Sequence, residues 1–136
     1  MASNLLNWPM GLAFDSSNTL YVAEYSNNRV QKFLSGTADT SSNQLNITYG
    51  IALDLGSNTL YVADYGNHRI MAYSSCASTG ILVAGGNGIR LNKTQMYNPS
   101  TIYFDSLSIS LTIANRYAHN IVRWTLGNTQ WTLISC

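Results

Sequence analysis

Charged residues are scarce in this sequence, and so are cysteine and proline. Asp, Glu, Lys and Arg make up only 10% of the 136 residues, the net charge is +1, and Lys and Arg form no run. A typical soluble domain has about 25% charged residues, so the polar surface here must come mainly from Asn, Ser and Thr. The lack of a basic patch argues against a nucleic-acid partner or an anionic membrane surface.

Long apolar runs and targeting features are also missing. No apolar run approaches the roughly 20 residues of a membrane-spanning helix. Residues 1–9 show no basic segment followed by a long apolar one, so we expect no signal peptide and no membrane span. The two glycosylation sequons, at Asn46 and Asn92, are about as many as chance gives in a chain so rich in Asn, Ser and Thr. The compartment therefore stays open.

The sequence does contain one stretch that occurs three times. Asn58–Tyr73 has a near copy at Asn18–Phe33 and a more divergent copy at Ser110–Trp124. Each copy predicts a β-hairpin, because strand formers such as Leu60–Ala63 are followed by turn residues and then by a second strand. Self-similarity of this length indicates a repeat protein.

A further short strand precedes each hairpin and ends in an aspartate, namely Asp15, Asp54 or Asp105. Each repeat therefore supplies three antiparallel strands joined by short turns. We predict them at about 10–15, 19–23 and 29–33; 50–54, 59–63 and 69–73; and 101–105, 110–114 and 120–124.

A fourth, outer strand is predicted only for the second and third repeats, at about 81–84 and 130–134. In the first repeat, Ser35–Asn43 is poor in apolar residues and predicts a loop. The spacing of the aspartates agrees, because it is 39 residues from Asp15 to Asp54 and 51 from Asp54 to Asp105. No window shows the apolar periodicity of a helix, so we predict none.

The second strand of each repeat is apolar on both faces, as in Leu60 and Val62 on one side and Tyr61 and Ala63 on the other. Such a strand fits a small sheet sandwiched between other sheets, as in a propeller blade. We therefore predict an all-β fold, an incomplete β-propeller of about three four-stranded antiparallel blades in which the outer strand of blade 1 is missing or degenerate. One domain, 1–136, would comprise repeats at about 5–43, 44–94 and 95–136.

The first two repeats share three short motifs. They are Pro9-x-Gly11-Leu12-Ala13-x-Asp15, Leu20–Glu24 and Asn27–Val30 in the first repeat, and Gly50-Ile51-Ala52-x-Asp54, Leu60–Asp64 and Asn67–Ile70 in the second. These motifs resemble the NHL repeat, and the likeness covers nearly the whole chain. The third repeat departs from the pattern, with Asn115 where the family has Asp and Asn120 where it has Arg. The resemblance implies a propeller of usually about six blades, so this chain looks like part of a larger propeller or one that associates with itself.

The best interpretation of function is a non-catalytic binding or scaffold module that contacts a protein partner through the loop faces of the propeller. The sequence shows no catalytic constellation, so we predict no enzymatic activity and no cofactor. Two alternatives stay open. One is a metal-dependent propeller enzyme of the lyase or hydrolase type, and the other is an RNA-binding propeller. The latter would need a basic, aromatic face, which seven scattered Lys and Arg residues do not supply.

The predicted binding face lies at the turns between the second and third strands. Exposed aromatic and arginine side chains on short turns are the residues that dominate binding hot spots. The alternative is that the tyrosines pack on the loop of the neighbouring blade. The histidines are interpreted as structural or surface residues rather than metal ligands, because they lie on different blades. The candidate residues are Tyr25, Tyr65, His68, Arg116, Tyr117 and His119.

Two further sets of residues carry structural predictions. Glu24 with Arg29, and Asp64 with Arg69, end the second strand and begin the third, so each pair is expected to hold its turn together. Asp15, Asp54 and Asp105 suit the start of a turn, although a ring of carboxylates at one mouth of the channel could attract a cation. No metal site is predicted.

Two expectations concern the chain as a whole. Cys76 follows a third strand and Cys136 follows a fourth, which puts them on opposite faces of the ring, so we expect no bond between them. Three blades would leave an apolar face uncovered at each end, so we expect the isolated chain to associate rather than behave as a closed monomer.

Overall fold

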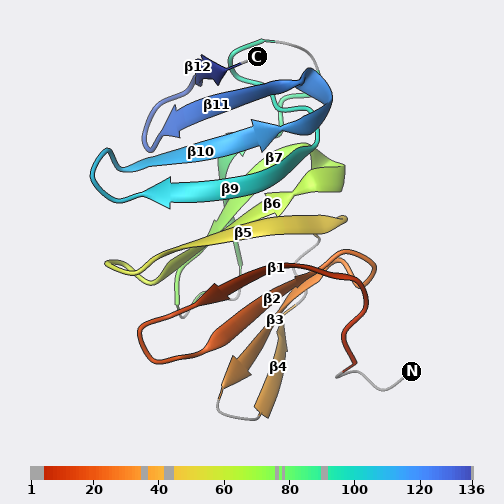
Figure 1. Cartoon of the computed structure of the whole chain (residues 1–136). Coiled ribbons are helices and arrows are strands. Elements are labelled where there is room, and N and C mark those ends of the chain that lie inside the picture. The colour runs from red at the N-terminus through yellow and green to blue at the C-terminus, as the bar shows by residue number, and fades with distance from the viewer. Residues whose placement is uncertain are drawn as a thin grey trace.

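The computed structural model describes residues 5–34, 37–41, 45–75, 77, 79–89 and 92–135. They form three four-stranded antiparallel sheets, which we call blades 1, 2 and 3 in chain order (Figure 1). Blade 1 contains β1 (Pro9–Phe14), β2 (Leu20–Glu24), β3 (Arg29–Leu34) and β4 (Thr37–Ser41); blade 2 contains β5 (Thr48–Asp54), β6 (Thr59–Asp64), β7 (Arg69–Tyr73) and β8 (Ile81–Gly85); blade 3 contains β9 (Pro99–Asp105), β10 (Ser110–Asn115), β11 (Asn120–Thr125) and β12 (Thr132–Ser135).

These bounds confirm the predicted strands to within two residues at each end. In the described ranges there is no α-helix; the only helical elements there are two single 3₁₀ turns, η1 (Tyr65–Asn67) and η2 (Arg116–Ala118). No helix among the described residues is long and apolar enough to cross a membrane.

Blade 1 corrects one prediction, because its outer strand is present. β4 pairs antiparallel with β3 where a loop was expected. The shorter first repeat is explained by its connections. The link between third and fourth strands has two residues in blade 1 and seven in blade 2, and the link to the next blade has six and thirteen. These two differences account for the twelve residues that separate the 39- and 51-residue spacings.

The blades stack through two apolar clusters, one at each junction. Val62 and Leu60 of β6 pack toward blade 1, in a cluster with Ala23 and Val30. The alternate residues of β6, Tyr61 and Ala63, pack toward blade 3. The cluster that contains them also includes Ile70, Met96, Ile113 and Trp124. β6 is therefore buried on both faces, as its sequence predicts.

The inner strands β1, β5 and β9 lie side by side in succession (Figure 1). Glycines permit this approach. A Cβ on Gly50 would lie 2.4 Å from the Ser100 carbonyl oxygen, and one on Gly11 would lie 2.7 Å from the Tyr49 carbonyl oxygen. Blade 3 has Thr101 at the corresponding register position, opposite Ala114 as Gly11 is opposite Ala23.

The outer face of blade 1 exposes apolar side chains that are covered in the other blades. Leu12 and Phe14 are 64% and 58% exposed, whereas Ile51 and Ile102, which correspond to Leu12, are 8% and 6% exposed. The difference arises because no blade packs on this face among the described residues. Cys76 and Cys136 lie outside the described residues.

Candidate functional site

The predicted binding residues lie in the turns between the second and third strands of each blade. In blades 2 and 3 these turns are η1 and η2. Each turn ends in a residue with left-handed backbone, Asn28, His68 or His119, whose φ angles are 53°, 56° and 51°. The similar φ angles show that the three turns share one geometry. Asn and His adopt this conformation more often than most residues with a side chain.

Aromatic rings from all three blades form a continuous band across these turns, which we call the aromatic band. Tyr49 stacks on Tyr65 with 5.3 Å between ring centroids, and Tyr25 contacts Tyr49 edge-on at 6.2 Å. Trp8 extends the band beyond Tyr25, at 5.6 Å. On the other side Tyr65 meets Tyr117 at 6.4 Å, and the band continues through Tyr97 to His68.

The structure corrects the expected exposure of one tyrosine. Tyr65 is only 8% exposed, because it is packed between Tyr49 and Tyr117, and this burial raises the pKa of its hydroxyl. Tyr25 and His68 are half-buried. The accessible part of the predicted face is in blade 3, where Tyr117 is 51% exposed and Arg116 and His119 are exposed. The Arg116 guanidinium lies 5.8 Å from the centre of the Tyr117 ring.

Three members of the aromatic band, Trp8, Tyr49 and Tyr97, are not predicted by the sequence repeats because they occupy different repeat positions. Each precedes or begins an inner strand, but Trp8 lies one residue before β1, Tyr97 two before β9, and Tyr49 lies inside β5. The sequence does have an aromatic residue near the start of every inner strand, which could have indicated the band. The pattern is found only if the residues are not required to occupy the same repeat position.

A short segment before each inner strand is fixed to its own blade. We call these segments the leaders: Leu6–Trp8, Leu45–Ile47 and Met96–Asn98. The middle residue of each leader donates its backbone N–H to the last residue of the second strand. The three bonds are Asn7 to Glu24 Oε1 at 2.8 Å, Asn46 to Asp64 Oδ1 at 2.8 Å, and Tyr97 to Asn115 Oδ1 at 2.6 Å.

The same acidic residues pair with arginine across their turns. Arg69 Nε lies 2.7 Å from Asp64 Oδ2, and Arg29 Nε pairs with Glu24 Oε2. Both carboxylates are fully buried, and each also accepts a hydrogen bond from the side chain of Asn27 or Asn67. The pairs therefore hold the leader and the turn of one blade together.

In blades 1 and 2, the left-handed residue of the turn connects its blade to the next one. Ile47 N–H donates to Asn28 Oδ1 at 2.6 Å, which joins blade 2 to blade 1. In the corresponding place, Asn98 N–H donates to His68 Nδ1 at 3.2 Å and joins blade 3 to blade 2. His68 must therefore have an unprotonated Nδ1, and it has a structural role that agrees with its replacement by Asn28 in blade 1.

We expect this contact to make the junction between blades 2 and 3 sensitive to pH. Burial lowers the pKa of the His68 imidazole, although the nearby Asp64 carboxylate opposes the change. Because the folded-state pKa is below the ordinary value of about 6.5, the unfolded chain takes up the proton more readily. The stabilisation is present above about pH 6.5 and is lost as the pH falls toward the folded-state pKa.

We expect the His68→Asn variant to lose this part of the pH dependence, since Asn28 shows that an amide oxygen accepts the same bond. The measurement is the urea midpoint at pH 7.5 and at pH 5.5. The wild-type midpoint should fall more than that of the variant. If the urea midpoint fell equally in the two proteins, protonation of His68 would not be what weakens the junction between blades 2 and 3.

The aspartates at the ends of the inner strands begin turns. Asp15 Oδ1 accepts from Ser17 N and Thr19 N, both at 2.9 Å. Asp54 and Asp105 accept equivalent bonds from Gly56 N and Leu107 N, and also from the hydroxyls of Ser57 and Ser108. These hydrogen bonds lower the pKa of all three carboxyls. Among the described residues, no three His, Cys, Asp or Glu side chains are grouped so that they could hold a metal ion.

Comparison with solved structures finds propeller folds. A chain in a nidogen/laminin complex has a TM-score of 0.74 and 22% identity, with 92% of this chain and 47% of that chain covered. Virginiamycin B lyase from Staphylococcus aureus has a TM-score of 0.71 and 15% identity, with 93% and 41% covered. An auxiliary nutrient binding protein from Bacteroides thetaiotaomicron has a TM-score of 0.71 and 16% identity, with 90% and 35% covered.

These likenesses and the three stacked antiparallel sheets define the class of the protein, which is a β-propeller protein represented by three blades. The family model for the NHL repeat matches residues 6–33 and 50–73, which lie in blades 1 and 2. The chain spans less than half the length of the three structures named above. No curated protein matches the sequence.

Proposed function

We propose that this chain is a non-catalytic binding module, and that it binds a protein partner through the blade 3 part of the aromatic band, where Tyr117 and the adjacent Arg116 are exposed. The NHL-repeat matches at residues 6–33 and 50–73 support a module of the binding or scaffold type. The observation that carries the proposal is that rings from three blades lie on one face and that Tyr117 and Arg116, which contact each other, are exposed there.

The support under these two side chains makes them suitable for binding. Backbone N–H groups of Arg116 and Tyr117 donate to the carbonyl oxygens of Asn98 and Tyr97, both at 3.2 Å, so η2 is fixed to the leader of its own blade. Side chains held on a rigid turn lose little conformational entropy when they bind. We expect the partner to present an apolar surface to Tyr117 and a carboxylate to Arg116.

Two of the similar structures are consistent with a binding role. One is a chain of a nidogen/laminin complex, and another is described as a nutrient binding protein. The same comparisons include lyases, so the fold alone does not distinguish a binding module from an enzyme, and the proposal depends on the aromatic band.

The test begins with affinity capture, with the wild-type chain as bait, and continues with the affinity of the captured protein for variants. Arg116→Ala combined with Tyr117→Ala should weaken binding by about 2 kcal/mol or more if these residues are anchors. The matched control is Ser17→Ala with Ser57→Ala, which changes two turns at the other ends of the strands. A loss of affinity in the control but not in the first variant would move the site to the opposite face.

A further inference from the structure

The two junctions between the blades use the same device, which consists of a leader and a hollow on the preceding blade. The first leader residue is the apolar plug. Leu45 is 7% exposed and packs with Ala23 and Val30 of blade 1, and Met96 is fully buried in the cluster that contains Ala63, Ile70 and Ala84 of blade 2. The third leader residue then donates its N–H to the left-handed Asn28 or His68. Each hollow thus receives an apolar side chain and one hydrogen-bond donor.

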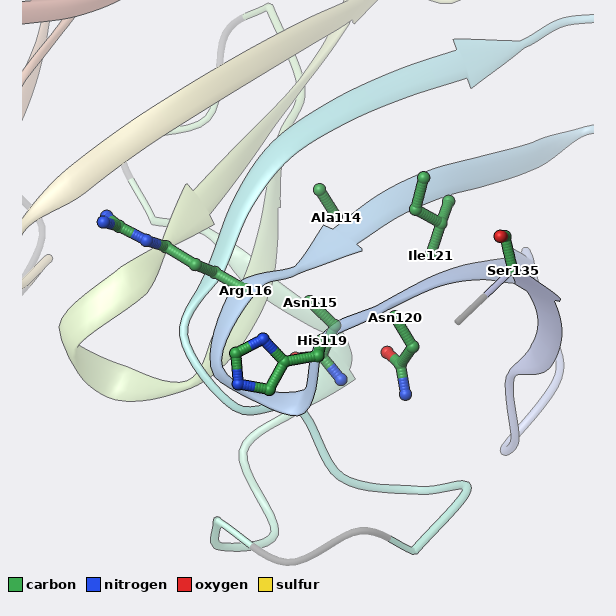
Figure 2. A pocket seen from close by; sticks show the side chains of 7 residues that line it. All are labelled: Ala114, Asn115, Arg116, His119, Asn120, Ile121 and Ser135. Carbon is green, nitrogen blue, oxygen red and sulfur yellow. The ribbon is translucent and has the colours of Figure 1, made fainter.

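Blade 3 has the same hollow, and no leader fills it in the described part of the chain. The hollow has a volume of about 330 Å³ (Figure 2). Ala114, Ile121 and Ser135 take the places of Ala63, Ile70 and Ala84, as the strand pairing shows. Ile121 is 41% exposed where Ile70 is fully buried. The lining residues are Ala114, Asn115, Arg116, His119, Asn120, Ile121 and Ser135.

The hydrogen-bond acceptor of this hollow is in place as well. His119 has the left-handed backbone of His68, with φ angles of 51° and 56°. In the described residues no donor contacts the His119 ring, whereas His68 Nδ1 accepts the Asn98 N–H. Figure 2 shows the His119 ring beside the hollow and Arg116 directed away from the other lining side chains.

The leader of blade 1 is the complement of this hollow. Leu6 is 46% exposed, although Leu45 and Met96 at the same position are buried. Trp8 has a φ angle of 53°, close to the 56° of Ile47 and the 53° of Asn98. Its N–H meets no acceptor among the residues that the structure describes. Because Glu24 holds Asn7 N–H and Tyr25 N–H donates to Trp8 O, the leader is already in the conformation that the other two leaders have in their junctions.

We propose that the hollow on blade 3 binds the Leu6–Trp8 leader of a second copy of this chain. Leu6 packs on Ala114 and Ile121, and Trp8 N–H donates to His119 Nδ1. The inference does not rest on the proposed function, although Arg116 lines this hollow and also belongs to the proposed partner site. The two surfaces are different, so copies join head to tail, and the assembly extends until its two ends meet.

The proposed joint differs from the internal ones at Thr101, which occupies the position of Gly50 but has a Cβ. A Cβ on Gly50 would lie 2.4 Å from a carbonyl oxygen of blade 3. The inner strands of two copies therefore stay further apart than β5 and β9, and the leader carries more of the contact. Thr101→Gly should allow the closer approach and tighten the association.

The test uses two variants that each remove one half of the joint. Leu6→Asp puts a charge on the plug, and Ile121→Arg fills the hollow; both side chains are more than 40% exposed, so each variant is expected to keep the fold. Light scattering with size-exclusion chromatography should show that wild type associates with rising concentration and that each variant alone is monomeric. An equimolar mixture of the two should give a heterodimer, because one intact joint remains.

Two controls make the result specific. Leu107→Asp changes a side chain that is 96% exposed in a turn at the other end of the strands, and it should associate like wild type. His119→Asn should keep the acceptor, as Asn28 does, whereas His119→Ala should weaken association at least tenfold. A wild-type chain that stays monomeric, variants that still associate alone, or a mixture that stays monomeric would each overturn the proposal.

Discussion

Replacing Arg69 with alanine is expected to destabilise the protein by about 3 kcal/mol, which is a large part of the stability of an ordinary domain. The reason is the Asp64 carboxylate, whose side chain is fully buried and would lose its cation. Asp64 would keep the N–H of Asn46 and the side chain of Asn67, which is why the loss is placed at the low end for a broken buried pair. The free energy of unfolding in urea, followed by circular dichroism, measures the effect.

Blade 3 provides the matched control for this variant. It has Asn115 and Asn120 at the positions of Asp64 and Arg69, and Asn115 Oδ1 still accepts the leader N–H at 2.6 Å. The double variant Asp64→Asn with Arg69→Asn copies this neutral arrangement and leaves no buried charge. It should therefore lose clearly less stability than Arg69→Ala, and an equal or larger loss would contradict the argument.

Replacing Gly50 with alanine is expected to cost about 3 kcal/mol through steric overlap between blades. The new Cβ would lie 2.4 Å from Ser100 O and 3.0 Å from Thr101 Cα, and both atoms belong to the backbone of β9. A flexible side chain could move aside, but a strand held in a four-stranded sheet cannot move without disturbing its own pairing. The loss should appear as a lower midpoint of thermal unfolding.

Gly56→Ala is the control for the glycine variant. Gly56 lies in the turn after β5, where the nearest atom to a new Cβ is a side-chain oxygen of Asp54 at 3.3 Å. The same change in residue type should therefore alter stability by only a few tenths of a kcal/mol up to about 1 kcal/mol. If the two alanine variants were equally stable, close approach of the inner strands could not be what requires glycine at position 50.

The strands could be predicted because local sequence determines them. Leu60–Ala63 alternates between two apolar faces, and the structure places those faces in two separate clusters. β4 was missed for the opposite reason. Its sequence, Thr37–Ser41, has little apolar character, and the strand is defined by its backbone pairing with β3. Edge pairing of this kind leaves almost no trace in the residue pattern.

The site was less accessible to sequence reasoning because its contacts join different blades. Tyr65 lies in a polar turn, which predicts exposure, but Tyr49 and Tyr117 cover it from two other segments. The partner of His68 is 30 residues away, at Asn98. The contact depends on the left-handed backbone of His68, which the residue type alone does not predict. Repeat position alone could show that Asn28 and His68 are equivalent, but not what they bind.

Because each leader is held by its own blade and inserted into the one before, the interchangeable module of this chain is not the four-stranded sheet. A module that could be copied, removed or transferred with its joint intact begins at a leader and ends just before the next, as residues 6–44 or 45–95 do. A cut at Thr48 would separate blade 2 from its leader. Insertions between strands leave the leader unchanged, which allows modules of 39 and 51 residues to follow one another in the same chain.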